Sequence, residues 1–224
     1  MSSQNPLNAY GPSGSRGGSA GSSRGEMVRS TARTSVVRLA QPVGLLVFMW
    51  LIRAFDWVLP GTFNTYGIRS WDPTSVFGIV ASPVLHSGWP HLISNTVPFL
   101  VLGLLVALDG VRRFWLVTVI VAVVSAVGTW VVNVPGTLTV GASGLVFGYF
   151  GYLLVRAFIA RSLGHAILYA VIALVVGVAY GSSMVVGILP IHQGISWQAH
   201  FFGAVGGGLA VWLFRPRKEA SAGS

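Results

Sequence analysis

The chain has 224 residues, of which 53% are hydrophobic and only 8% are charged. Soluble proteins carry about 25% charged residues, so this composition excludes an ordinary soluble globular domain. The 14 basic residues outnumber the 5 acidic ones, but they are scattered between long apolar runs, which argues against a nucleic-acid partner. No cysteine is present, so a disulfide framework, a thiolate metal site and a cysteine nucleophile are excluded.

The first 35 residues are rich in serine, glycine and arginine and contain almost nothing to bury. A segment of this kind cannot recover the entropy lost on ordering. We therefore expect residues 1–40 to form a disordered basic tail. The tail lacks the basic, apolar and small-residue order of a cleaved signal peptide. The domain expected to fold is 41–214, followed by a second short tail at 215–224.

Six apolar runs follow the tail, and each is long enough to cross a bilayer, which takes about 20 residues. They cover 42–60, 91–108, 114–133, 143–160, 166–187 and 197–214. Backbone polar groups in lipid must be satisfied within the segment, so each run is expected to be a helix. The sequence thus predicts an all-α membrane protein with six transmembrane helices.

Basic residues flank these runs asymmetrically. Twelve of them lie before the first run, after the second, at the end of the fourth or after the sixth, whereas only Arg53 and Arg69 fall on the other side. By the positive-inside rule, both termini are expected in the cytoplasm. The expected location is a plasma membrane, with bacterial origin favoured by the near absence of lysine. The first outer connection, 61–90, is rich in aromatic residues and is expected to lie in the membrane interface.

The first polar cluster enters the second run. His86 precedes Pro90, where a helix can begin, and His91 and Asn95 follow it. Positions 91 and 95 are four apart, so on a helix the two side chains share a face. Polar groups in lipid are costly, so these residues are functional candidates. The alternative is that they only hold neighbouring helices together. A metal site is not favoured, because almost no carboxylate lies nearby.

The second polar cluster starts the fourth run, where Ser143 lies between Gly141 and Gly144. A lone serine in a transmembrane helix usually hydrogen-bonds a carbonyl of its own helix. The glycines remove side chains around the hydroxyl and permit close backbone approach. A nucleophile that attacks a bulky peptide carbonyl needs that clearance.

The third cluster is in the sixth run, where His200 lies about one turn inside. Small residues recur every four positions there, at Ala199, Gly203 and Gly207, and the fourth run carries an opposing set, at Gly144, Gly148 and Gly151. Such ridges predict close helix packing. If these two helices pack, Ser143 and His200 lie at similar depth and a contact between them is plausible.

These residue types match acyl-transfer chemistry. Serine is a weak nucleophile until a base takes its proton, and neutral histidine is the usual base near pH 7. The oxyanion of the intermediate needs donors, which the Asn95 amide, the His91 ring and the Ser143 N–H could supply. The acids between the tails are Asp56, Asp72 and Asp109, and none has an evident route to His200. The sequence therefore predicts a Ser–His dyad.

The three motifs resemble those of the rhomboid intramembrane serine proteases. They are His-x-x-x-x-His-x-x-x-Asn at 86–95, Gly-x-Ser-Gly at 141–144 and Ala-His-x-x-Gly-x-x-x-Gly at 199–207. Each is weak alone, but all three fall in the expected runs, order and depth. The resemblance covers about 41–214.

The resemblance implies a six-helix rhomboid-like bundle that cuts single-span membrane proteins in or near their transmembrane segments. The implied roles are nucleophile for Ser143, general base for His200, oxyanion lining for His86, His91 and Asn95, and support for Gly141, Gly144, Phe147 and Gly203. The fifth helix and the loop 188–196 would form a gate and cap over a water-filled cavity open to the outside. Transmembrane protein substrates and the bilayer are the implied partners, without a metal or cofactor.

Two features depart from the family pattern. Many relatives carry a tyrosine four residues after the serine, where its ring stacks on the catalytic histidine. Here Phe147 keeps the aromatic face without the hydroxyl. Many relatives also carry a Trp-Arg pair in the first outer loop, and here the nearest candidates are Arg69 and Trp71 in reversed order. The departures affect the expected stability of the loop, while the dyad is intact.

Three alternatives stay open. One is an inactive relative that binds transmembrane clients, against which the presence of both Ser143 and His200 argues. Another is a small transporter or channel, for which an inverted repeat is expected and none is found. The last is a membrane protein whose polar residues serve only helix packing.

The other polar residues have structural interpretations. His165 is expected to contact solvent or lipid headgroups, and His192 lies in the outer loop close to the site by topology. Arg53 and Asp56 are three apart on the first helix and are expected to pair near the outer interface.

Overall fold

A computed structural model describes residues 19–59, 63–159 and 195–215, with single positions between 163 and 178. The chain divides into two units, Met1–Val36 and Val37–Ser224. The packing and the site described below belong to the second unit.

The first helix, α1, runs from Ser19 to Val58. Residues 19–40, which the sequence assigns to the tail, are part of this helix. Helix formation is cooperative, so each residue added to an existing helix gains a hydrogen bond without a new nucleation cost. No proline occurs between Pro12 and Pro42 to stop the helix. Residues 1–18 lie outside the described part of the chain.

Four further helices follow the predicted runs to within three residues, namely α3 (Trp89–Ala107), α4 (Val111–Val132), α5 (Ser143–Ile159) and α7 (Trp197–Phe214). Pro90 is accommodated in the first turn of α3, where its missing N–H costs nothing. Within the described residues, three helices are long and apolar enough to cross a membrane, Arg33–Val58, α3 and α4. The fifth predicted run, 166–187, lies largely outside the described residues, so the count of six stays a prediction.

The first outer connection is built from short elements. They are η1 (Asn64–Tyr66), β1 (Ile68–Arg69), η2 (Pro73–Ser75), α2 (Gly78–Ala81) and η3 (Ser82–Val84). Strand β1 pairs antiparallel with β2 (Leu138–Thr139). The pairing joins this connection to the loop that leads into Ser143.

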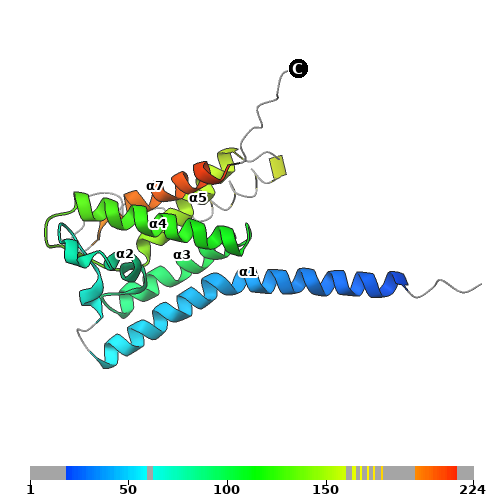
Figure 1. Ribbon diagram of the computed structural model, residues 1–224, viewed down its shortest axis with the longest axis horizontal. Helices are drawn as coiled ribbons and strands as arrows, with labels where there is room; N and C mark the ends of the chain where they lie inside the picture. Colours follow the sequence, from blue (N-terminus) through cyan, green and yellow to red (C-terminus); the bar gives the residue numbers. More distant parts are fainter. Residues whose placement is uncertain are drawn as a thin grey trace, which may run out of the picture. The chain divides into compact units, whose positions relative to one another are not determined.

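Helix α7 lies against both α4 and α5, as Figure 1 shows. A Cβ atom built on Gly203 would come within 2.3 Å of the Gly144 carbonyl oxygen, and one on Gly207 within 2.0 Å of the Gly148 oxygen. The facing Gly151 meets the backbone of Ala204 in the same way. The two glycine ridges predicted from the sequence are thus confirmed as the interface between α5 and α7.

The core of the bundle lies between α3, α4 and α5. Its largest fully buried side chains include Tyr149, Tyr152, Phe99, Phe114 and Leu92. The Tyr149 hydroxyl is paired with Thr118, at 2.7 Å, so the buried phenol keeps a hydrogen-bond partner.

Ion pairs are found at two positions in the described unit. The Arg53–Asp56 pair is present on α1, as predicted, and Asp56 also accepts the Phe63 backbone N–H at 3.1 Å. Near the start of α4, Asp109 accepts from Arg156 at 2.8 Å and from the Tyr152 hydroxyl at 2.6 Å. The second cluster ties the α3–α4 turn to α5.

Candidate active site

Ser143 is the first residue of α5 and is half-buried. The turn before it contains Gly141, whose φ of +125° is a conformation that side chains with a Cβ rarely adopt. The Gly141 N–H donates to the Ser82 carbonyl at 2.8 Å, which anchors the turn to the first outer connection. A Cβ on Gly141 would lie 2.6 Å from the His91 ring. Glycine is therefore required here both by the backbone and by the neighbouring histidine.

The two histidines of the first motif meet this turn. His86 is 2% exposed, and its Nε2 accepts the Ala142 N–H at 3.3 Å. The His86 and His91 rings are edge to face, with centroids 5.2 Å apart. Both rings therefore lie beside the backbone that immediately precedes Ser143.

The pKa of His86 is lowered to about 3, chiefly because burial disfavours the charged ring and also because His91 and Arg53 are close. The side chain is therefore neutral near pH 7. A neutral imidazole has one acceptor nitrogen. Since Nε2 accepts from Ala142, the ring proton is on Nδ1.

Asn95 lies one turn beyond His91 on α3 and is buried. Its Nδ2 donates to the His91 backbone carbonyl at 2.9 Å. The His91 Nδ1 is paired with the Ser87 hydroxyl at 3.1 Å. When Ser87 is the donor, the proton of neutral His91 is on Nε2, the nitrogen that lies toward Gly141.

His200 is buried in the first turn of α7. Its ring stacks flat on Phe147, with centroids 4.1 Å apart and an interplanar angle of 6°. The ring contact that the family resemblance implies for Phe147 is thus present, without the hydroxyl.

Ser143 and His200 lie on adjoining helix ends. Phe147 is one turn after Ser143 on the same face of α5, and helical side chains lean toward the preceding turn. The close approach of Gly203 to Gly144 fixes the separation of the two helices at this level. Within the described residues, no hydrogen bond joins the Ser143 hydroxyl to His200.

Ser125 on α4 also lies at this site, although it belongs to none of the three sequence motifs. Its hydroxyl donates to the Ala199 carbonyl at 2.8 Å, and a Cβ on Gly144 would lie 2.5 Å from its Oγ. Ser125 thus touches the residue after Ser143 and the residue before His200. The sequence pattern that could have indicated Ser125 is a stripe of polar residues along the otherwise apolar α4 and its C-cap. The stripe consists of Thr118, Ser125, Thr129 and Asn133, all of which are buried.

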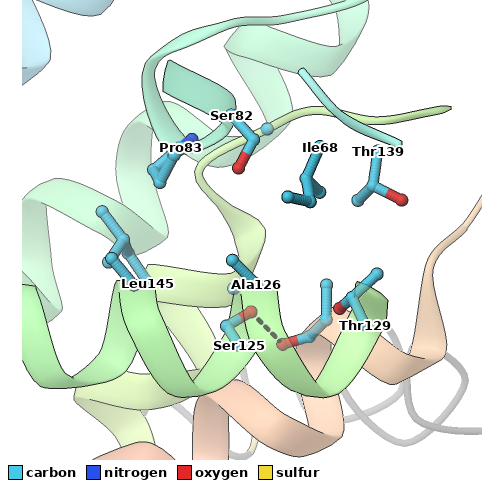
Figure 2. Close-up of a pocket in the computed structure, with 12 residues that line it drawn as sticks. Ile68, Ser82, Pro83, Ser125, Ala126, Thr129, Thr139 and Leu145 are labelled. Carbon is cyan, nitrogen blue, oxygen red and sulfur yellow. Dashed lines mark hydrogen bonds between the residues drawn. The ribbon is translucent and has the colours of Figure 1, made fainter. Parts of the chain in front are cut away.

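A cavity of about 20 Å³ lies behind the turn at Gly141, which is room for about one water molecule. Figure 2 shows Ser82, Ile68 and Thr139 on one side of it and Ser125 and Thr129 on the other. The cavity therefore separates the first outer connection from α4.

The remaining predicted elements lie outside the described residues. They are His165, His192, most of the fifth run at 166–187 and all but the end of the loop 188–196. The gate and cap expected there stay predictions.

Comparison with known proteins gives the family. The model of the Rhomboid domain matches residues 73–217, which is more than half of the chain and spans α3 to α7. The chain therefore belongs to the rhomboid family, as its motifs indicated. Together with its long apolar helices, this makes it a multi-pass membrane protein.

Three bacterial proteins are similar to the chain. An uncharacterized protein of Mycobacterium tuberculosis is 36% identical over 186 residues, which cover 79% of this chain and 75% of that protein. An uncharacterized protein of Mycobacterium leprae is 36% identical over 183 residues, which cover 76% of this chain and 70% of that protein. A Bacillus subtilis protein named as a candidate rhomboid protease is 32% identical over 143 residues, which cover 63% of this chain and 68% of that protein.

Proposed function

We propose that the protein is an intramembrane serine endopeptidase that cleaves single-span membrane proteins in or near their transmembrane segment. The observation that carries the proposal is the flat stack of His200 on Phe147, one helical turn from Ser143. A buried histidine held beside the N-terminus of a helix that begins with a glycine-flanked serine is suited to activate that serine.

The proposed reaction is acyl transfer to Ser143 followed by hydrolysis. The Ser143 Oγ attacks the scissile carbonyl carbon while its proton passes to a ring nitrogen of His200. His200 then gives the proton to the leaving amine as the C–N bond breaks. A water molecule, deprotonated by His200, attacks the acyl-enzyme and releases the second product with Ser143 restored.

The oxyanion is proposed to be held by donors from α3 and α5. Neutral His91 with its proton on Nε2 and the Ser143 backbone N–H are suitable donors. Asn95 contributes its second amide hydrogen, since the first is engaged by the His91 carbonyl. The bond from Ala142 to His86 Nε2 favours His86 as the residue that fixes the backbone before Ser143.

The partners of the aspartates support a dyad without a third, acidic residue. Asp56 pairs with Arg53, Asp109 pairs with Arg156, and Asp72 accepts from Thr74 at 2.6 Å. Each aspartate between the two tails is thus engaged away from His200.

We further propose that both termini are cytoplasmic and that the site opens to the outer side of the plasma membrane. The support is the positive-inside distribution of twelve basic residues against two. In this orientation the first outer connection and the turn before Ser143 lie at the outer interface.

The test is cleavage of a purified single-span substrate in liposomes, with the products mapped by mass spectrometry. Wild type is expected to cut within or next to the transmembrane segment, and Ser143→Ala and His200→Ala are each expected to abolish cleavage. Ser35→Ala is the matched control, because Ser35 is an exposed serine on α1 and belongs to none of the three motifs. Cleavage retained in Ser143→Ala contradicts the mechanism, whereas client binding without cleavage by wild type supports the inactive-relative alternative.

A further inference from the structure

The outer end of α4 holds the first turn of α7 through an amide pair. The Gln198 Nε2 donates to the Asn133 Oδ1 at 3.0 Å, and both side chains are buried, at 7% and 9% exposure. Gln198 is two residues before His200. The bond therefore acts on the backbone turn that carries the proposed general base.

Asn133 also caps the end of α4 and is hydrogen-bonded to the first outer connection. Its N–H donates to the Thr129 carbonyl at 3.0 Å, and its own carbonyl accepts the Trp71 Nε1–H at 3.1 Å. Trp71 stacks on Trp130, with centroids 5.9 Å apart. One residue thus joins three segments, the first outer connection, α4 and α7.

Trp71 has a φ of +65°, which is uncommon for a bulky residue and strains the backbone. Such a conformation persists only where the surroundings impose it. Here the stack on Trp130 and the bond to Asn133 impose it. The strain indicates that this junction is held in a single arrangement.

The two sides of the first turn of α7 have different partners. Residues two apart on a helix point about 200° apart, so Gln198 faces α4 while His200 faces Phe147 on α5. Between them, the Ala199 carbonyl accepts from Ser125. The turn is therefore fixed from the α4 side by two hydrogen bonds, and its opposite side presents the imidazole.

We propose that Asn133 and Gln198 are positioning residues that set the orientation of the His200 ring toward Ser143. The proposal rests on the proposed protease function. Loss of the amide pair releases the α4 side of the turn, so the imidazole loses alignment while substrate contacts are unchanged. The expected effect is on kcat, since a displacement of about 1 Å at a reacting group can cost up to a hundredfold in rate.

The experiment measures kcat and KM of the full chain in liposomes. Gln198→Ala and Asn133→Ala are each expected to lower kcat by about tenfold or more, with KM within about twofold of wild type. The exchange variant Asn133→Gln with Gln198→Asn keeps a hydrogen bond between two side-chain amides, because the summed length of the two side chains is unchanged. It is expected to restore most of the rate. Gln198→Met, which keeps the side-chain volume, replaces Gln198→Ala if the alanine variant does not fold.

Gln41→Ala is the control, because the Gln41 amide also makes two hydrogen bonds, donating to the Val37 carbonyl and accepting from Trp115, but it lies on α1 and contacts neither α7 nor His200 in them. It is expected to keep the wild-type kcat. The proposal is overturned if the Gln198 variants keep wild-type kcat, or if the exchange variant is as slow as the single ones. Absence of cleavage by wild type instead overturns the proposed function, so the two failures are distinguishable.

Discussion

At the level of single residues, the support of His200 depends on an aromatic face, and the hydroxyl found in many relatives is not needed for the stack. Phe147→Ala removes the ring that lies 4.1 Å from the imidazole. We expect this change to lower kcat by about tenfold to a hundredfold, while Phe147→Tyr keeps the rate within a few-fold. Steady-state cleavage of a single-span substrate measures both, and equal rates for Phe147→Ala and wild type would contradict the role of the stack.

The buried His86 makes stability depend on pH. The free ring has a pKa near 6.5 and the folded one a pKa of about 3, so between these values the unfolded state binds more protons. Stability is therefore full above pH 6.5 and falls as the pH drops toward 3, by up to about 1.4 kcal/mol per pH unit. His86→Asn is expected to remove this dependence.

The pH effect is measured as the unfolding midpoint in mixed detergent micelles at pH 7 and pH 4.5. The quantity to compare is the acid-induced drop in wild type and in His86→Asn, since the other histidines are common to both. Equal drops in the two proteins would show that His86 is not buried in the neutral form.

The candidate site residues could be selected from the sequence, but some of their hydrogen-bond partners could not. Ser143, His200 and Phe147 stand out because polar or aromatic types recur at helical spacing beside glycines. The bond from Ala142 to His86 depends on where the first outer connection folds back, and no local pattern encodes that. The same holds for Ser125, whose partner is 74 residues away.

At the level of elements, the α5–α7 interface leaves no room for a methyl group. A Cβ at Gly207 would lie 2.0 Å from the Gly148 oxygen and 2.6 Å from the Tyr152 nitrogen, both of them backbone atoms that cannot move aside. We expect Gly207→Ala to destabilise the protein by about 1–3 kcal/mol and to lower activity as the helices separate.

The neighbouring Gly208 supplies the control. A Cβ there would meet only the Val155 Cγ2 at 3.6 Å, an ordinary contact. Gly208→Ala is expected to unfold at the wild-type midpoint or above, because alanine favours helix over glycine. The same loss of stability in both variants would mean that helix propensity, and not the interface, is being measured.

The element boundaries follow from the sequence where apolar runs end at glycine, proline or charge, as α3, α4, α5 and α7 do. The start of α1 at Ser19 could not be predicted, because it arises from propagation of an existing helix and not from burial. The role of Arg69 and Trp71, which occur in reversed order, is also visible only in the fold. Arg69 donates to the Gly136 carbonyl at 3.0 Å and Trp71 to that of Asn133, so the pair holds the loop before Ser143.

At the level of the whole molecule, the distribution of charge predicts the orientation in the membrane. The chain has no cysteine, so single cysteines can report the side on which they lie. In intact cells, Tyr66→Cys in η1, where the side chain is 60% exposed, is expected to react with a membrane-impermeant maleimide. Ser221→Cys is expected to react only after the membrane is opened. The reverse pattern would contradict cytoplasmic termini and an outward-facing site.

Activation of Ser143 by His200 is tested by covalent trapping of the nucleophile. The full chain in liposomes is treated with a fluorophosphonate probe, and the modified residue is identified by mass spectrometry. We expect one phosphonylated residue, Ser143, with labelling lost in Ser143→Ala and reduced by at least about a hundredfold in His200→Ala. Modification of another serine, or labelling of Ser143 at the wild-type rate without His200, would contradict it.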